Sequence, residues 1–477
     1  MKMPKCQQTE QPTVFGWASI ARVGLVQAAL GAVVVMTTST LNRVMVVEHA
    51  LPALLPGVLV ALHYLVQMAR PRMGFGSDVG GRRTPWIIGG MAVLGLGGVV
   101  AALATAWMGT DRSAGIVLAL LGYALVGLGV SASGTSLLVM LAKRVPHGRR
   151  AGAATLVWMM MIAGFAVTAG LAGHWLDPYS PARLVTVTSV VCLFAFVLTL
   201  AAVRGLEGPA IAPGEQPAHR PYGEPLAKPR FREALREVWA EPLARRFTVF
   251  VFVSMLAFSA QDLILEPFAG TVFGYSPGAS TQLSGVQNGG VLLGMLLVAF
   301  ASAAGARLSH HRTWRHVGSL RGWTIGGCLA SGAALAALSL AGMHGEGAPL
   351  KTIVFALGVS NGAFSIGAIG SMMRLASEGR QQREGVRMGL WGAAQAIAFG
   401  LGGLVGTGAS DLARSLIASP GEAYALVFAL EGGVFLIAAL LAWRISAPAP
   451  ARIALRSFSH PTAGAGLSAG TPQRQTT

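Results

Sequence analysis

Twelve long apolar runs constrain this chain more than any other feature. A helix that crosses a bilayer needs about 20 consecutive, mainly apolar residues, and each run is close to that length. Only 12% of the residues are charged, whereas an ordinary soluble domain carries about a quarter. The sequence therefore predicts an all-α integral membrane protein. The runs are residues 20–41, 52–69, 85–108, 114–141, 152–173, 183–203, 247–270, 281–305, 319–342, 351–374, 387–412 and 423–443.

The distribution of basic residues predicts the orientation of these helices. Basic loops stay in the cytoplasm, and an even number of spans places both termini on one side. If the termini and every even-to-odd loop are cytoplasmic, 31 of the 36 Lys and Arg residues lie there. The exceptions are Arg43, Arg112, Arg183, Lys351 and Arg414. Because the basic residues lie in short gaps rather than in one patch, the net charge of +17 does not indicate a nucleic-acid partner.

The chain divides into two sets of six runs around a proline-rich connector. Two six-helix bundles related by an axis along the membrane normal are the repeat plan of major facilitator transporters. Within the connector, residues 231–247 have an apolar face, which indicates either an amphipathic helix on the membrane surface or a plain soluble helix. The expected parts are a cytoplasmic tail (1–19), a first bundle (20–203), a cytoplasmic linker (204–246), a second bundle (247–443) and a disordered cytoplasmic tail (444–477).

A charged, glycine-rich stretch, RPRMGFGSDVGGRRTPW, joins the second and third runs. Its glycines permit tight turns, and its aspartate can accept hydrogen bonds from the arginines nearby. One interpretation is a cytoplasmic latch that holds two helices in one of two arrangements. The other is an ordinary basic loop. The latch candidates are Gly74, Asp78, Gly81, Arg82 and Arg83.

Two polar clusters lie inside the predicted spans, where ionisable side chains are costly and usually face a cavity or a partner. Asp262 and Glu266 are four residues apart and share a helix face, so they repel each other unless a cation is near or one holds a proton. If the halves are pseudo-symmetric, Arg43 could pair with either acid and close the cavity on the periplasmic side. Alternatively, both clusters are caps near the lipid headgroups. These gate candidates are Asn42, Arg43, Glu48, Gln261, Asp262 and Glu266.

Other polar or aromatic residues within the spans are candidates for lining a central cavity. His63 lies in the middle of the second run, where a neutral imidazole could bind the magnesium of a tetrapyrrole or simply hydrogen-bond to a neighbour. No other metal site is predicted, since the three cysteines are far apart. The cavity candidates are His63, Gln287, Asn288, Trp391, Gln395 and Glu431.

Three motifs together resemble the PucC family, the bacteriochlorophyll-delivery members of the major facilitator superfamily. They are TLNRVMVVE at 40–48, GSDVGGRRTPW at 76–86 and QDLILEPFAG at 261–270. The stretch from His63 to Met91 most resembles the branch of this family labelled bacteriochlorophyll synthase 44.5 kDa chain. The sequence departs from proton-coupled facilitators, which commonly have an arginine just before the glycine pair of the fourth helix. Here Tyr123 to Val126 precede Gly127.

The resemblance implies that the chain delivers or holds (bacterio)chlorophyll for light-harvesting complex assembly in a bacterial inner or intracytoplasmic membrane. The implied partners are lipid, this pigment as ligand, and light-harvesting subunits or pigment-synthesis enzymes. No enzyme activity is expected, because a prenyltransferase would need aspartate-rich motifs that hold magnesium and diphosphate. Two alternatives remain: a proton-coupled transporter of another amphiphile, titrating at Asp262, Glu266 and Glu431, and a non-transporting scaffold for pigment enzymes.

Overall fold

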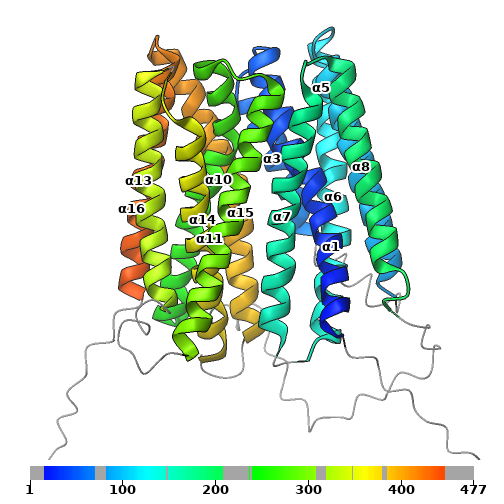
Figure 1. Cartoon of the computed structure of the whole chain (residues 1–477), viewed down its shortest axis with the longest axis vertical. Helices are drawn as coiled ribbons and strands as arrows, with labels where there is room; N and C mark the ends of the chain where they lie inside the picture. Colours follow the sequence, from blue (N-terminus) through cyan, green and yellow to red (C-terminus); the bar gives the residue numbers. More distant parts are fainter. Residues whose placement is uncertain are drawn as a thin grey trace, which may run out of the picture.

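The computed structural model describes residues 15–69, 82–146, 149–207, 236, 239–307, 319–345, 347–378 and 384–445. In these residues, twelve membrane helices form two six-helix halves that stand side by side (Figure 1). The predicted connector lies largely outside the described residues, as do most of both tails. Of the expected surface helix at 231–247, residues 231–235, 237 and 238 lie outside the described part, and residues 242–247 form the start of the membrane helix α10.

The N-terminal half begins with a composite helix. Its α-helical part, α1 (Trp17–Val35), continues without a break through η1 (Met36–Thr40), α2 (Leu41–Arg43) and η2 (Val44–Glu48), where η1 and η2 are π-helical turns. The other helices of this half are α3 (Leu54–Val66) with the 3-10 turn η3 (Gln67–Ala69), α5 (Thr84–Trp107), α6 (Arg112–Arg144), α7 (Arg150–Leu176) and α8 (Pro181–Val203).

The C-terminal half repeats this arrangement with six further helices. They are α10 (Pro242–Phe273), α11 (Pro277–Arg307), α13 (Leu320–His344), α14 (Leu350–Glu378), α15 (Glu384–Leu416) and α16 (Pro420–Ile445). Eleven of the twelve helices are long and apolar enough to cross a membrane, and α3 is a shorter apolar helix. The predicted all-α membrane fold is therefore confirmed.

Local sequence signals explain where several helices begin and end. Asp111 and Ser180 accept hydrogen bonds from the backbone N–H groups three residues later and so cap α6 and α8. Gly274 has a φ of 66°, which glycine adopts at little cost, and this ends α10. The largest departure from the predicted runs is the first helix, which ends at Glu48 rather than near residue 41.

Two helix pairs form most of the contact between the halves: α7 packs against α11, and α3 packs against α15. We call the end of the bundle where the first helix ends, at Glu48, the outer end. The opposite end, where α1 begins and α16 ends, is the inner end (Figure 1). The distribution of basic residues predicts that the outer end is periplasmic.

Candidate functional site

The two π-helical turns of the first helix present polar side chains to the C-terminal half. Extra residues in a helical turn change the direction of the side chains that follow, and such turns are frequent at functional sites. The turns η1 and η2 contact α10, and η1 also contacts α11. Ser39, Thr40, Asn42 and Arg43 are all buried in this region. A polar interface thus lies between the halves, in the middle and outer part of the bundle.

Asn42 donates a hydrogen bond to a carbonyl of α10 that a proline leaves without its usual donor. Pro267 lies inside this helix, and proline has no N–H to donate to the carbonyl four residues earlier, that of Leu263. The Asn42 side-chain amide donates to the Leu263 carbonyl oxygen at 2.6 Å. Asn42 is fully buried, so water cannot take its place. The N-terminal half therefore satisfies a backbone group of the C-terminal half.

Glu266 joins hydroxyl groups from both halves. The Ser39 hydroxyl on η1 and the Ser284 hydroxyl on α11 both donate to the same carboxylate oxygen of Glu266. One helical turn away on α11, the Thr281 hydroxyl lies 3.1 Å from that of Thr40. All five side chains are buried. This group is a second polar connection across the interface.

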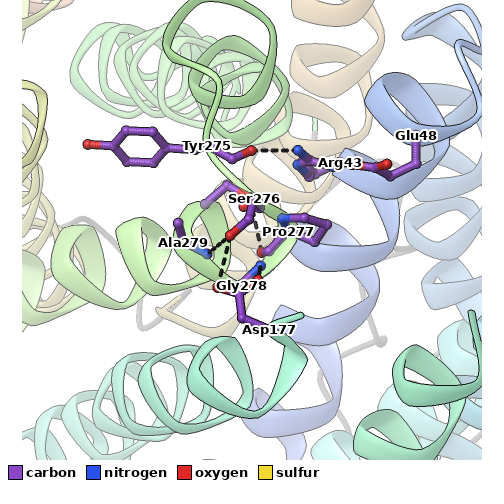
Figure 2. A network of polar contacts seen from close by, with 9 residues as sticks. Arg43, Glu48, Asp177, Tyr275, Ser276, Pro277, Gly278 and Ala279 are labelled. Atoms are coloured by element: carbon purple, nitrogen blue, oxygen red, sulfur yellow. Dashed lines mark hydrogen bonds and ion pairs between the residues drawn. The ribbon is translucent and has the colours of Figure 1, made fainter. Parts of the chain in front are cut away.

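Arg43 bridges the halves through a backbone carbonyl rather than through an acid of α10. Its guanidinium donates to the Tyr275 carbonyl oxygen at 2.6 Å and forms an ion pair with Glu48 (Figure 2). The expected pairing with Asp262 or Glu266 is therefore not the one in the structure. The reason is local: the first helix continues through η2, so Glu48 lies next to Arg43, and Glu266 is occupied by serine hydroxyls.

Asp177, just after α7, holds the first turn of α11 in the opposite half. Its carboxylate accepts hydrogen bonds from the Ser276 hydroxyl at 2.9 Å and from the Gly278 backbone N–H at 3.3 Å (Figure 2). A Cβ atom on Gly278 would lie 2.4 Å from the Asp177 carboxyl carbon. Glycine is therefore required for this close approach.

Asp411, near the end of α15, makes the reciprocal contact with the first turn of α3. Its two carboxylate oxygens accept hydrogen bonds from the backbone N–H groups of Ala53, at 2.9 Å, and Leu54, at 2.7 Å. Helix N-termini attract carboxylates because their first N–H groups lack partners within the helix. The fifth helix thus caps the eighth, and the eleventh caps the second. We refer to the contacts of Arg43, Asp177 and Asp411 with the opposite half as the outer closure.

Tyr179 lies beside the outer closure, in the turn after α7. Burial raises its pKa to about 12, the charge of Glu48 adds to this effect, and the charge of Arg43 opposes it. Its hydroxyl therefore stays protonated at physiological pH. The phenol therefore lies close enough to Arg43 and Glu48 for their charges to act on it.

The remaining acids and amides of the C-terminal half make fewer hydrogen bonds than the groups at the interface. The Gln287 amide donates to Asp262 at 3.3 Å, and the Asn288 amide donates to the Ser284 carbonyl at 2.9 Å. Glu431 on α16 is buried, and neither of its carboxylate oxygens has a hydrogen-bond partner among the described residues. The same holds for both polar atoms of the buried Gln261 side chain, within the described part of the chain.

Two of the cavity candidates are packed inside their own halves. His63 is 2% exposed, and its Nε2 lies 2.7 Å from the amide nitrogen of Gln67. This arrangement does not fit a magnesium ligand, because the whole ring is buried and a macrocycle has no access to either nitrogen. Trp391 is buried edge-on against Phe247, with 4.8 Å between the ring centres. Gln395 is half-buried on α15.

Of the predicted latch loop, Gly74, Asp78 and Gly81 lie outside the described residues. Arg82 is exposed, and the backbone N–H of Arg83 donates to Glu207 at 2.6 Å.

Glu207 holds the helix that follows this loop, and sequence reasoning did not single it out. The backbone N–H and hydroxyl of Thr84 donate to its second carboxylate oxygen at 2.9 and 2.8 Å. Arg144 donates to its backbone carbonyl at 3.0 Å. Burial opposes ionisation, but these hydrogen bonds and the charge of Arg83 outweigh burial and lower the pKa of Glu207. The residue therefore ties together α5, α6 and the end of α8.

Comparison with protein families and relatives gives matches along most of the chain. The family described as PUCC protein matches residues 40–449. The chain is 52% identical over 427 residues to the "Bacteriochlorophyll synthase 44.5 kDa chain" of Rhodobacter capsulatus, covering 90% of this chain and 95% of the relative. It is 29% identical over 422 residues to "Protein PucC" of Rhodovulum sulfidophilum, covering 85% and 88%.

Solved structures of transporters share the fold. A peptide transporter POT in complex with sulfate superimposes with a TM-score of 0.65 at 15% identity, covering 93% of this chain and 98% of the transporter. A bacterial homologue of the human lysosomal transporter Spinster gives a TM-score of 0.58 at 16% identity, covering 90% and 95%. At this level of identity the likeness shows the fold alone, which is that of the major facilitators.

Proposed function

The chain belongs to the PUCC protein family, and we propose that it is a membrane carrier or assembly factor that handles (bacterio)chlorophyll for light-harvesting complexes. The observation that carries this proposal is the 52% identity to a relative named for bacteriochlorophyll synthesis, over 90% of the chain. The fold supports it, since a two-half facilitator has its substrate site between the halves. The polar groups of this chain gather in that place.

The outer closure is the gate in this proposal. An opening of the outer end has to separate α7 from α11 and α3 from α15. The contacts of Asp177 and Asp411 with helix N-termini, and that of Arg43 with Tyr275, would break together. Each links groups on opposite halves, so their combined loss adds to the energetic cost of opening. The gate role of Asn42 and Glu266 follows from the same geometry, because both connect the halves.

We do not assign the chain a synthase reaction of its own. In the described residues, no three His, Cys, Asp or Glu side chains gather in a way that could hold a metal ion. The acids of α10 contact hydroxyls and an amide between helices. A scaffold for pigment enzymes, without transport, is the alternative that fits the name of the relative most directly.

A second alternative is a proton-coupled transporter of another amphiphile, and one observation favours it. Glu431 and Asp262, on α16 and α10, lie within electrostatic reach of each other. Glu431 is buried and Asp262 is half-buried. Their negative charges repel, and proton uptake by one of them removes the repulsion. Such a pair is the kind of site at which a proton gradient acts.

The test is the absorption spectrum of the full-length chain, purified gently from a host that makes bacteriochlorophyll. Near-infrared pigment bands close to one pigment per chain support the proposal. A colourless protein with uptake that depends on a pH gradient supports the transporter. A colourless protein that co-purifies with a pigment synthase supports the scaffold. Either colourless outcome contradicts direct pigment handling.

The variant His63→Ala is a control for where any pigment binds. Because Gln67 occupies Nε2 and the ring is buried, we expect unchanged pigment per chain at an equal protein yield. A large loss of pigment at an equal yield would instead show that His63 is the magnesium ligand.

A further inference from the structure

The interior of the C-terminal half contains two groups of aromatic side chains at different depths. In the outer group, Phe268 of α10 lies 5.0 Å from Phe428 of α16, measured between ring centres. The inner group joins three helices. The ring of Phe258 on α10 lies 6.3 Å from that of Phe364 on α14, which in turn lies 5.7 Å from that of Phe435 on α16. Aromatic rings therefore lie on both the outer and the inner side of the residues between these two groups.

Each of the three helices places a polar residue between the two aromatic groups. Gln261 lies three residues after the inner ring of α10, and Asn361 lies three residues before that of α14. Glu431 lies three residues after the outer ring of α16 and four before its inner ring. Residues three or four apart share a helix face, so all three polar side chains lie on the faces that carry the rings.

Contacts with α13 bring two of these polar residues together. The Ser331 hydroxyl of α13 donates to the side-chain oxygen of Asn361 at 2.8 Å. The next residue, Gly332, packs directly against Gly432 of α16, because a Cβ atom on Gly432 would lie 3.2 Å from the Gly332 carbonyl oxygen. Asn361 and Glu431 therefore lie beside the same short stretch of α13.

The polar groups between the aromatic rings lack hydrogen-bond partners. Both carboxylate oxygens of Glu431, both polar atoms of the Gln261 amide and the amide nitrogen of Asn361 are buried and unpaired within the described residues. Gln261 is 1% exposed and Asn361 0%. Buried polar groups without partners are costly, and each needs an explanation. Apolar packing does not explain five such atoms, whereas a bound ligand does.

This region also carries negative charge without a basic partner from its own half. Asp262, next to Gln261, is half-buried and lies close enough to Glu431 for their charges to interact. In the described helices of the C-terminal half, every lysine and arginine lies in the first or last five residues of its helix. Two ionised carboxylates in this position repel unless a cation is close. A single proton would pair one carboxylate oxygen and leave the amides unsatisfied.

We propose that this region binds one alkali cation, held by the carboxylates of Glu431 and Asp262 and the side-chain oxygen of Gln261. Hard cations take oxygen ligands from carboxylates and from amide side chains alike. Asp262 shares a helix face with Glu266, which contacts the N-terminal half, so the ion can enter past Asp262 from between the halves. The inference is independent of the pigment proposal, because its ligands all lie in one half.

Binding of radioactive sodium to the full chain in detergent, at fixed pH, tests this site. We expect one saturable site per chain in the wild type and loss of binding in Glu431→Gln, which keeps the shape of the side chain and removes its charge. Glu422→Gln, the same substitution at an exposed position of α16, is the matched control and should bind as the wild type does. Sodium chloride should also raise the unfolding midpoint of the wild type more than choline chloride does, because a ligand of the folded state stabilises it.

A wild type without saturable sodium binding would overturn the proposal, as would full binding in Glu431→Gln. A midpoint that changes with pH but not with sodium would overturn it in favour of proton uptake. Gln261→Leu serves if Glu431→Gln does not fold, because it removes a ligand oxygen without changing the charge. This variant should bind sodium more weakly than the wild type, and an unchanged affinity would contradict the proposed site.

Discussion

At the scale of single residues, the interface depends on backbone groups that one half leaves unpaired and the other half pairs. Pro267 frees the Leu263 carbonyl, and Asn42 supplies the missing donor. The sequence shows both residues but not their relation, because 221 residues separate Asn42 from Leu263. The motifs thus predict polar residues at the interface, but not their partners: Arg43 contacts Tyr275 and Glu48 rather than the predicted Asp262 or Glu266.

This relation predicts an unusual rescue. Asn42→Ala leaves a buried carbonyl without a partner and should cost about 1–3 kcal/mol of stability. Adding Pro267→Ala should recover much of that loss, because the new N–H can donate to the Leu263 carbonyl. The measurement is the midpoint of unfolding in detergent for both single variants and the double variant. Additive losses in the double variant would show that Asn42 acts in some other way.

Glu207 makes a prediction about pH. Its pKa is lowered in the folded protein, so its contribution to stability is present above the ordinary glutamate pKa, about 4.3. That contribution is lost as the pH falls through the lower folded value. Glu207→Gln should therefore unfold at a lower temperature than the wild type at neutral pH, and the difference should shrink on acidification.

Thermal unfolding of the two proteins from neutral pH downward measures this difference directly. Since other carboxylates titrate in both proteins alike, only the gap between the curves is informative. If the difference in unfolding temperature stayed constant or increased as the pH falls, it would contradict a helix cap that depends on ionised Glu207.

At the scale of helices, apolar runs predict the number and approximate position of the spans because lipid cannot satisfy backbone hydrogen bonds. The apolar runs do not predict features that depend on tertiary contacts. The π turns of the first helix carry it to Glu48, and no local signal marks them. Asp177 and Asp411 look like ordinary residues near turns, and only the assembled halves bring them to the N-termini of α11 and α3.

The close approach of α7 and α11 predicts the effect of a single methyl group. Gly278→Ala would force a Cβ atom against the Asp177 carboxylate, and such overpacking typically costs about 1–3 kcal/mol. Gly289→Ala, on the same helix with open space around its Cα, is the control and should be neutral or slightly stabilising. Unfolding midpoints of the two variants in the same detergent make the comparison, and equal values would contradict the tight contact.

At the scale of the whole molecule, the outer closure has an internal symmetry. The fifth and eleventh helices each end near an aspartate, and these cap the eighth and second helices of the opposite half. The repeat plan of the fold makes these pairs equivalent. The two contacts therefore should be made and broken together when the halves move.

In the proposed function, the outer end opens or closes with pigment between the halves. A ligand changes such an equilibrium only if it binds the two arrangements unequally. The most direct measurement is the distance between spin labels at Ser113→Cys on α6 and Lys351→Cys on α14, both exposed at the outer end. In nanodiscs, saturating bacteriochlorophyll should shift the distance distribution, and Asp177→Asn with Asp411→Asn should lengthen it without pigment. An identical distribution with and without bound pigment would contradict the account.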